Sequence, residues 1–125
     1  MHVPILKQGN YLIASVQSAL SDTDWAQLQD DLAERVGQFR SRGVIIDVTV
    51  LDVVDSFATR TLRAIAHILK LRGAETVIVG LQPDVAFAMV QMGLTLEGVE
   101  TALDLEEGLA YHDRLAGKGA KHGKQ

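Results

Sequence analysis

The 125 residues of this chain suffice for one domain with a substantial core, and a composition of 47% apolar and 22% charged residues is typical of a globular protein. The formal net charge of −4 includes three lysines in residues 116–125, so residues 1–115 carry −7. An acidic body argues against general nucleic-acid binding, and the absence of cysteine excludes disulfides, thiolate catalysis and cysteine-ligated metals.

Nothing in the sequence indicates export or a membrane span. No apolar run approaches the roughly 20 residues that cross a bilayer, and the N-terminus lacks a basic region followed by an apolar one. Since the lack of cysteine also fits a reducing compartment, we expect a cytoplasmic location.

The N-terminal part of the chain predicts a β-hairpin followed by a helix. Residues 3–6 and 11–16 are typical of short strands, and the Gln-Gly-Asn turn between them supplies residues that accept positive φ. Ser21 and Asp24 have the spacing of a capping box, which predicts the start of a helix. Its apolar residues then recur at helical intervals, at Trp25, Leu28, Leu32, Val36 and Phe39.

The rest of the chain alternates strand and helix. The expected elements are a buried strand at 44–48, a helix from Asp55 or Ser56 to Gly73, a strand at 76–79, a helix from Pro83 to Gly93, an extended piece near 99–102 and a helix from Asp104 to about Leu115. Such alternation implies right-handed parallel crossovers. We therefore predict an α/β domain over residues 1–115, with a mixed, mostly parallel sheet of four to five strands and about four helices. The Gly- and Lys-rich residues 116–125 are expected to form a flexible tail.

An Asp-Ser pair stands where the strand at 44–48 and a short acidic loop lead into the next helix. If Ser56 were the N-cap, its hydroxyl would be occupied by a backbone N–H; if Asp55 caps, that hydroxyl is free for a kinase. We favour the second arrangement, because Asp caps about as well as Ser. A phosphate on Ser56 would then lie at the positive end of the helix dipole. The plain alternative is that the pair is only a helix cap.

A helical wheel of this segment separates a buried face from a basic one. Apolar residues from Ala58 to Leu69 should face the sheet, whereas a basic stripe lies on the opposite side, made of Arg60, Arg63, His67 and Lys70. Phe57 lies on the flank, where an aromatic ring can anchor a partner. We predict Asp55, Phe57, Thr59 and Arg60 as partner-binding residues. A simply solvated stripe and a structural role for Thr59, which could otherwise accept phosphate itself, remain alternatives.

Other chemistry finds little support in the sequence. A Mg²⁺ site formed by Asp47, Asp52 and Asp55 is less favoured than loop acids that solvate a turn and cap a helix. The four histidines show no ligand spacing, and no phosphate-binding Gly-rich loop or nucleophile motif is present. We expect no catalytic residues, no metal and no cofactor.

The run from residue 44 to Ser56, the helix after it and the Gly80-Leu-Gln-Pro turn, with a helix ending at Gly93, resemble the STAS domain. This domain is shared by sulfate transporters and bacterial anti-sigma-factor antagonists, and the resemblance covers essentially residues 3–113. In this family the serine directly after the strand-loop aspartate is phosphorylated by a dedicated serine kinase. Ser56 stands at that position here.

The residues after Ser56 point to a subgroup. Sporulation-type antagonists continue Asp-Ser-Ser-Gly or Asp-Ser-Thr-Gly, whereas this chain reads Asp55-Ser56-Phe57-Ala58, which resembles RsbS-type stressosome scaffolds. The resemblance implies a scaffold that self-associates or assembles with multidomain RsbR-type co-antagonists, sequesters a serine/threonine switch kinase of the RsbT type and releases it on phosphorylation. The alternative function is a soluble small-ligand or nucleotide-binding STAS module that uses the acidic loop and the helix terminus.

Overall fold

Five strands form one mixed sheet in the computed structural model, which describes residues 3–124 and their side chains as far as residue 117. The strands are β1 (Ile5–Gln8), β2 (Tyr11–Ser15), β3 (Gly43–Asp47), β4 (Glu75–Val79) and β5 (Glu100–Ala102), and they lie in the sheet in chain order. β1 is antiparallel to β2, and every later pair is parallel. The predicted fold class, including the opening hairpin, is confirmed.

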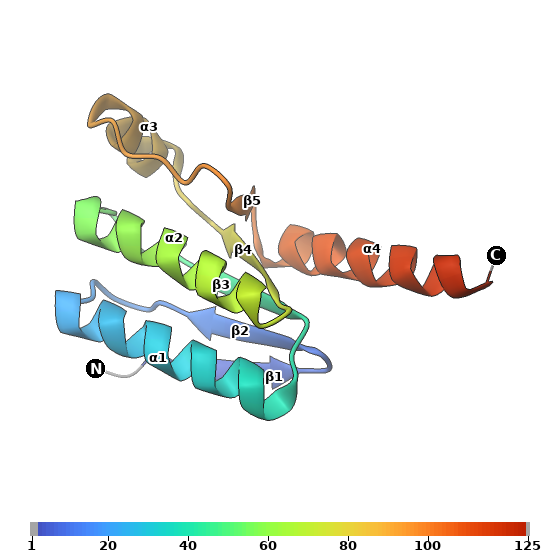
Figure 1. The fold of residues 1–125 in the computed structure, drawn as a ribbon. Helices are drawn as coiled ribbons and strands as arrows, with labels where there is room; N and C mark the ends of the chain where they lie inside the picture. Colours follow the sequence, from blue (N-terminus) through green and yellow to red (C-terminus); the bar gives the residue numbers. More distant parts are fainter. Residues whose placement is uncertain (1–2, 125) are drawn as a thin grey trace.

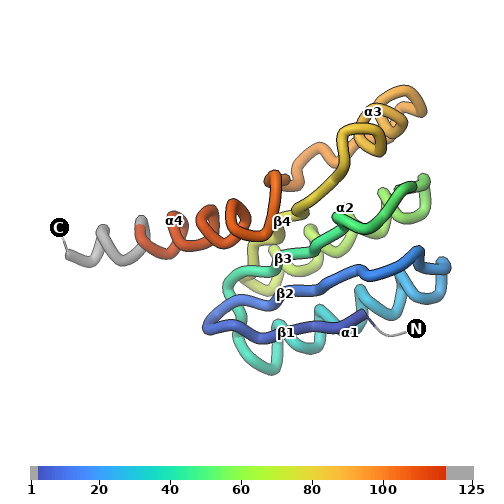
Figure 2. The backbone as a smooth tube through the Cα atoms, turned by 180° about the vertical axis from the view of Figure 1, so that it is seen from behind, coloured from blue at the N-terminus to red at the C-terminus, as the bar shows by residue number. Residues whose placement is uncertain are grey.

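The helices are α1 (Asp22–Phe39), α2 (Ser56–Leu71), α3 (Pro83–Gln91) and α4 (Leu105–Lys124). α1 and α2 lie side by side on one face of the sheet, and α4 contacts β3, β4 and β5 (Figure 1). Seen from behind in Figure 2, the sheet lies in front of α1 and α2, and α3 projects past the ends of the strands. The starts of α1, α2 and α3 thus gather at the carboxyl end of the sheet.

The alternation of side chains along β3 divides the core into two layers. Val44 and Ile46 belong to the large cluster packed against α1 and α2, whereas Ile45 belongs to a smaller cluster on the side of α4. All three are fully buried. β-Branched residues suit such a doubly covered strand, because their stiff side chains pack well on a pleated surface. α2 contributes Leu62, Ile65 and Leu69 to the large cluster, as the wheel predicted.

The first turns of α4 approach the sheet closely because two glycines leave room. A Cβ added to Gly108 would lie 2.7 Å from Cγ1 of Val79, and one added to Gly43 would lie 2.7 Å from the His112 ring. His112 is buried, with Nε2 3.1 Å from the carbonyl oxygen of Val44. The imidazole therefore fills space at the start of β3.

Tyr11 connects β2 to α4 beside this histidine. Its ring stacks on His112 with a centroid distance of 5.2 Å, and its hydroxyl donates to Oδ1 of Asp113 at 2.8 Å. Burial, and then the bond to this carboxylate, raise the pKa of Tyr11 to about 12. The hydroxyl is thus a stable donor at neutral pH.

Two elements differ most from what the sequence indicated. β1 spans Ile5–Gln8 rather than residues 3–6, and α4 continues to Lys124 rather than ending near Leu115. The expected flexibility of residues 116–125 stays a prediction. Phe39, counted in the apolar pattern of α1, is 38% exposed. None of the helices in the described part of the chain has the length and apolar character to cross a membrane.

The buried histidine predicts a loss of stability in mild acid. Burial lowers the pKa of His112 below 6.5, against the opposing effect of its bond to the Val44 carbonyl. The unfolded chain therefore binds a proton more readily than the folded one, and stability falls as the pH drops below about 6.5. Urea unfolding at pH 7.5 and 5.5 should show this loss.

The His112→Gln variant should lose less stability between these two pH values, whatever its stability at pH 7.5. His67→Gln, which removes an exposed histidine of α2, is the matched control and should keep the wild-type loss. If His112→Gln shows the same pH dependence as the wild type, His112 does not cause the loss of stability in mild acid.

Candidate functional site

Asp55 is the N-cap of α2. Its backbone is extended (φ −80°, ψ −174°), and its Oδ1 accepts the N–H of Ala58 at 2.8 Å. The Asp55 carbonyl accepts the N–H of Thr59 at 2.9 Å and so closes the first turn. Of the two arrangements that the sequence left open, the favoured one is confirmed.

Ser56 is consequently the first residue of the helix, and it is exposed. Throughout the described residues its hydroxyl makes no hydrogen bond, because the capping role has passed to the preceding aspartate. The side chain also lies at the end of the helix where unpaired N–H groups and the dipole favour negative charge. The oxygen is therefore accessible, and a phosphate there would meet a favourable backbone field.

The loop before the helix is held to the core by two buried residues. Leu51 and Val54 are only 4% and 2% exposed, and both belong to the large core cluster. Between them Asp52 and Val53 face solvent, and Val53 is 71% exposed. Ser56 is thus presented from an anchored loop beside an exposed apolar side chain.

A second set of contacts ties this loop to the loop after β4. Oδ1 of Asp47 accepts from Thr49 N–H at 2.9 Å and from Thr49 Oγ1 at 2.6 Å, and the Thr49 carbonyl accepts from Nε2 of Gln82 at 2.5 Å. Gly80, at φ +81°, has no room for a Cβ beside Thr49. Sequence reasoning missed these contacts, although an Asp two residues before a Thr is a turn signal.

The hydrogen bonds of Asp47 and Asp55 count against the alternative that these carboxylates, with Asp52, bind Mg²⁺. The carboxylate of Asp47 serves Thr49 and that of Asp55 serves Ala58, so both have structural partners. Across the residues that the structure describes, no group of three His, Cys, Asp or Glu side chains is placed to hold a metal ion.

The predicted contact residues differ in their surroundings. Arg60 is exposed, and Phe57 is half-buried against the core cluster. Thr59 is 1% exposed, and its Oγ1 donates to the carbonyl of Asp55 at 2.8 Å. Because this side chain points back onto its own helix, we do not include Thr59 in the contact surface or as a second acceptor of phosphate.

An apolar hollow of about 200 Å³ lies beside Asp55, between the loop before α1 and the loop before α2. Its lining comprises Ala19, Leu20, Trp25, Leu51, Val53, Asp55 and Ala58. The hollow joins two segments that are distant in sequence, residues 19–25 and 51–58, so no local pattern could reveal it. It offers space for an apolar side chain next to Ser56, and its only charged group is a carboxylate already engaged in capping.

Comparison with known proteins places these features in a family. The model of the STAS domain family matches residues 2–108. The RsbT co-antagonist protein RsbRA of Bacillus subtilis is 30% identical over 89 residues, which are 70% of this chain and 32% of RsbRA. A second co-antagonist of that organism, RsbRD, is 26% identical over 81 residues. The chain spans about a third of the length of these curated relatives.

Solved structures agree with that assignment. A serine-to-glutamate variant of RsbS from Moorella thermoacetica superposes with a TM-score of 0.79 at 36% identity, over 91% of this chain and 97% of that one. A chain of the stressosome, described as a signal integration and transduction hub, gives a TM-score of 0.77 at 37% identity, over 90% and 98%. The antagonist SpoIIAA, at 14% identity and a TM-score of 0.67, shares the fold.

The cap assignment predicts unequal effects of neighbouring substitutions. Asp55→Ala should lower the free energy of unfolding by about 1 kcal/mol, because it leaves the Ala58 N–H without its acceptor. Asp55→Asn should retain most of that stability. Ser56→Ala is the matched control and should change it little. Urea denaturation measures all three variants, and a larger loss in Ser56→Ala than in Asp55→Ala would show that serine is the cap.

Proposed function

This chain belongs to the STAS domain family, and we propose that it is a regulatory scaffold that holds a serine kinase until Ser56 is phosphorylated. The partner kinase is a switch kinase of the RsbT type, and the scaffold acts with RsbR-type co-antagonists in a stressosome-like assembly. The protein itself performs no catalysis and acts in the cytoplasm.

The observation that carries this proposal is the free hydroxyl of Ser56 at the head of α2. A kinase substrate must offer an oxygen that is both exposed and unbonded, and here Asp55 supplies the cap that would otherwise occupy it. Val53 and the apolar hollow beside Asp55 offer a kinase a surface next to that oxygen.

Phosphorylation would act on the surface rather than on the fold. A phosphate brings close to two negative charges, which Asp55 repels and the helix terminus attracts. The two effects partly cancel, so the domain should keep its structure. A partner that covers Ser56 would instead have to bury an uncompensated charge beside apolar side chains, which is strongly unfavourable. Phosphorylation of Ser56 should therefore exclude the kinase from this surface.

Assembly with other STAS domains is supported by an exposed apolar surface. The short helix α3 leaves Phe87 and Val90 exposed by 65% and 74%, and Met92 directly after it by 60%. Large apolar side chains grouped in this way are typical of protein interfaces. We propose this surface for contacts between copies or with co-antagonists.

The alternative of a small-ligand or nucleotide-binding module finds no specific support at this site. It relied on the acidic loop and the start of α2, where two of the three carboxylates, those of Asp47 and Asp55, are already bonded to Thr49 and Ala58. The adjacent hollow is apolar and small. Neither feature provides the set of donors that phosphate and base recognition require.

Two variants of Ser56 test the switch. Ser56→Asp should lose binding to the purified RsbT-type kinase, because a charge then stands where the kinase docks, whereas Ser56→Ala should bind like the wild type. Isothermal titration calorimetry measures both. Equal affinity of the two variants would refute exclusion.

The modification itself can be mapped directly. Incubation of the wild-type chain with the kinase and ATP should place phosphate on Ser56 in tryptic peptides analysed by mass spectrometry, and Ser56→Ala should remain unmodified under the same conditions. Phosphate on another residue, with Ser56 untouched, would refute the assignment.

A further inference from the structure

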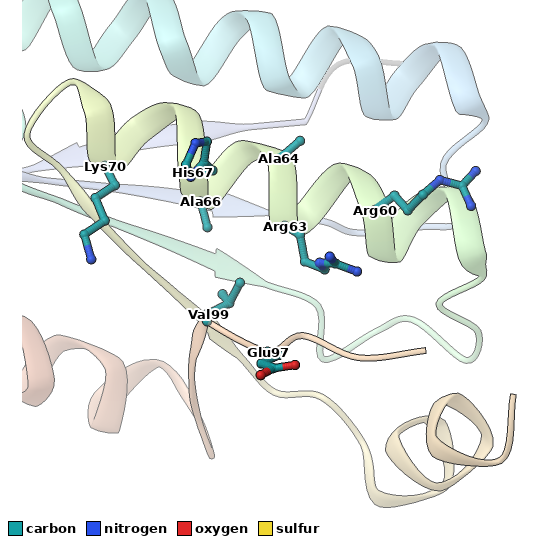
Figure 3. A pocket seen from close by; sticks show the side chains of 9 residues that line it. Arg60, Arg63, Ala64, Ala66, His67, Lys70, Glu97 and Val99 are labelled. Carbon is teal, nitrogen blue, oxygen red and sulfur yellow. The ribbon is translucent and has the colours of Figure 1, made fainter. Parts of the chain in front are cut away.

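A groove of about 620 Å³ runs along α2 on the side away from α1 (Figure 3). We call it the basic groove; it is lined by Arg60, Arg63, Ala64, Ala66, His67 and Lys70 of α2 and by residues 97–99 before β5. Figure 3 shows Arg63 and Lys70 reaching from the helix toward the segment that carries Glu97 and Val99. Ala64, Ala66, Gly98 and Val99 are the small and apolar residues of the lining.

Within the described residues, two of the three formal cations of this groove have no ion pair. α2 carries three formal positive charges and no acidic residue, although the chain as a whole is acidic. Lys70 makes an ion pair with Glu75 at 3.9 Å. In the described part of the chain Arg60 and Arg63 have no ion pair and no hydrogen bond, even though Glu97 lines the opposite wall. The two guanidinium groups are therefore available to an anionic ligand.

Ser56 lies on the same stripe of the helix as these cations. Arg60 is four residues after it, Arg63 seven and His67 eleven, so all project within a narrow arc. Side chains at i and i+4 are neighbours on a helix surface, and a phosphate paired with an arginine is among the stronger charge-assisted contacts. A phosphate on Ser56 is thus one helical turn from the first cation of the groove.

The extent of the groove favours a protein segment over a small anion. Arg60 and Lys70 are ten residues apart, which corresponds to about 15 Å along the helix. Charges spread over that distance match acidic side chains repeated along an extended or helical segment, whereas one phosphate group could meet only part of them. The methyl groups of Ala64 and Ala66 and the side chain of Val99 suit packing against such a segment.

We propose that the basic groove docks an acidic segment of the partner kinase, and that a phosphate on Ser56 competes with this segment for Arg60. The inference rests on Ser56 as the modification site of the proposed function and adds the chemistry of the partner. Phosphorylation then weakens docking in two ways: it repels the acidic segment and occupies a cation that the segment needs.

The first experiment concerns the chain alone and needs no kinase. Phosphoserine is installed at position 56 by genetic encoding, and its phosphate is titrated by ³¹P NMR. Arg60→Gln should raise the phosphate pKa by a few tenths, because the charged dianion loses its neighbouring cation. Asp55 is present in every variant, so the comparison isolates Arg60. Arg42→Gln, an exposed arginine before β3, is the control and should leave the pKa unchanged. An unchanged pKa in Arg60→Gln would overturn the competition.

The second experiment tests docking with the purified RsbT-type kinase. Arg63→Glu should weaken binding to the unphosphorylated chain by about tenfold or more, and the salt dependence of binding should fall. Arg42→Glu is the matched charge reversal outside the groove and should bind like the wild type. Circular dichroism checks that both variants fold.

The outcomes separate this inference from the proposed function. If the wild type binds the kinase, Ser56→Asp does not, and Arg63→Glu binds as tightly as the wild type, the groove proposal is overturned and the switch at Ser56 stands. Inorganic phosphate and ATP serve as small-anion probes in the same calorimeter. Micromolar binding of either one that Arg63→Glu abolishes, without loss of kinase binding, would assign the groove to a small ligand and overturn the docking role.

Discussion

The hydrogen bond from the Ala58 N–H to the Asp55 carboxylate is the interaction on which the site depends. It fixes where α2 begins, and it leaves the next side chain without a structural task. Moving the cap by one residue would bond the serine oxygen to the backbone and place the aspartate outside the helix. The same start makes Ser56 a helical residue, so the helical repeat aligns it with Arg60 and Arg63. One short contact thereby decides both accessibility and the electrostatic surroundings of the candidate acceptor.

The rest of the domain keeps this geometry in place. Buried Leu51 and Val54 hold the preceding loop to the core, and the Thr49 carbonyl bonded to Gln82 ties that loop to its neighbour. Polar and charged groups are then free to vary on the outside of α2 without affecting the buried layers. A modification at Ser56 on such a frame changes charge at a surface and leaves the packing beneath it intact, which is the property that a reversible binding switch requires.

Local signals in the sequence predicted most of the fold and the centre of the site. The capping box at Ser21 and Asp24, the apolar run of β3 and the wheel of α2 each depend on neighbouring residues, and each is confirmed. Features that depend on distant segments were not predictable in this way. The apolar hollow around Trp25 and the contact between Thr49 and Gln82 arise where separate segments meet, and a helical wheel does not include such neighbours. The wheel also did not predict that Thr59 is buried. The extension of α4 to Lys124 was missed because the glycines at positions 117, 119 and 123 have low helix propensity.

The central claim is that Ser56 can carry a phosphate without disturbing the domain. The most direct test compares the backbone amide chemical shifts of the unmodified chain with those of the chain carrying phosphoserine at position 56. The account predicts changes confined to the preceding loop and the first turns of α2, with the amides of β3, β4 and α1 unchanged. Shifts spread through those core elements, or loss of helical signals at the start of α2, would contradict it.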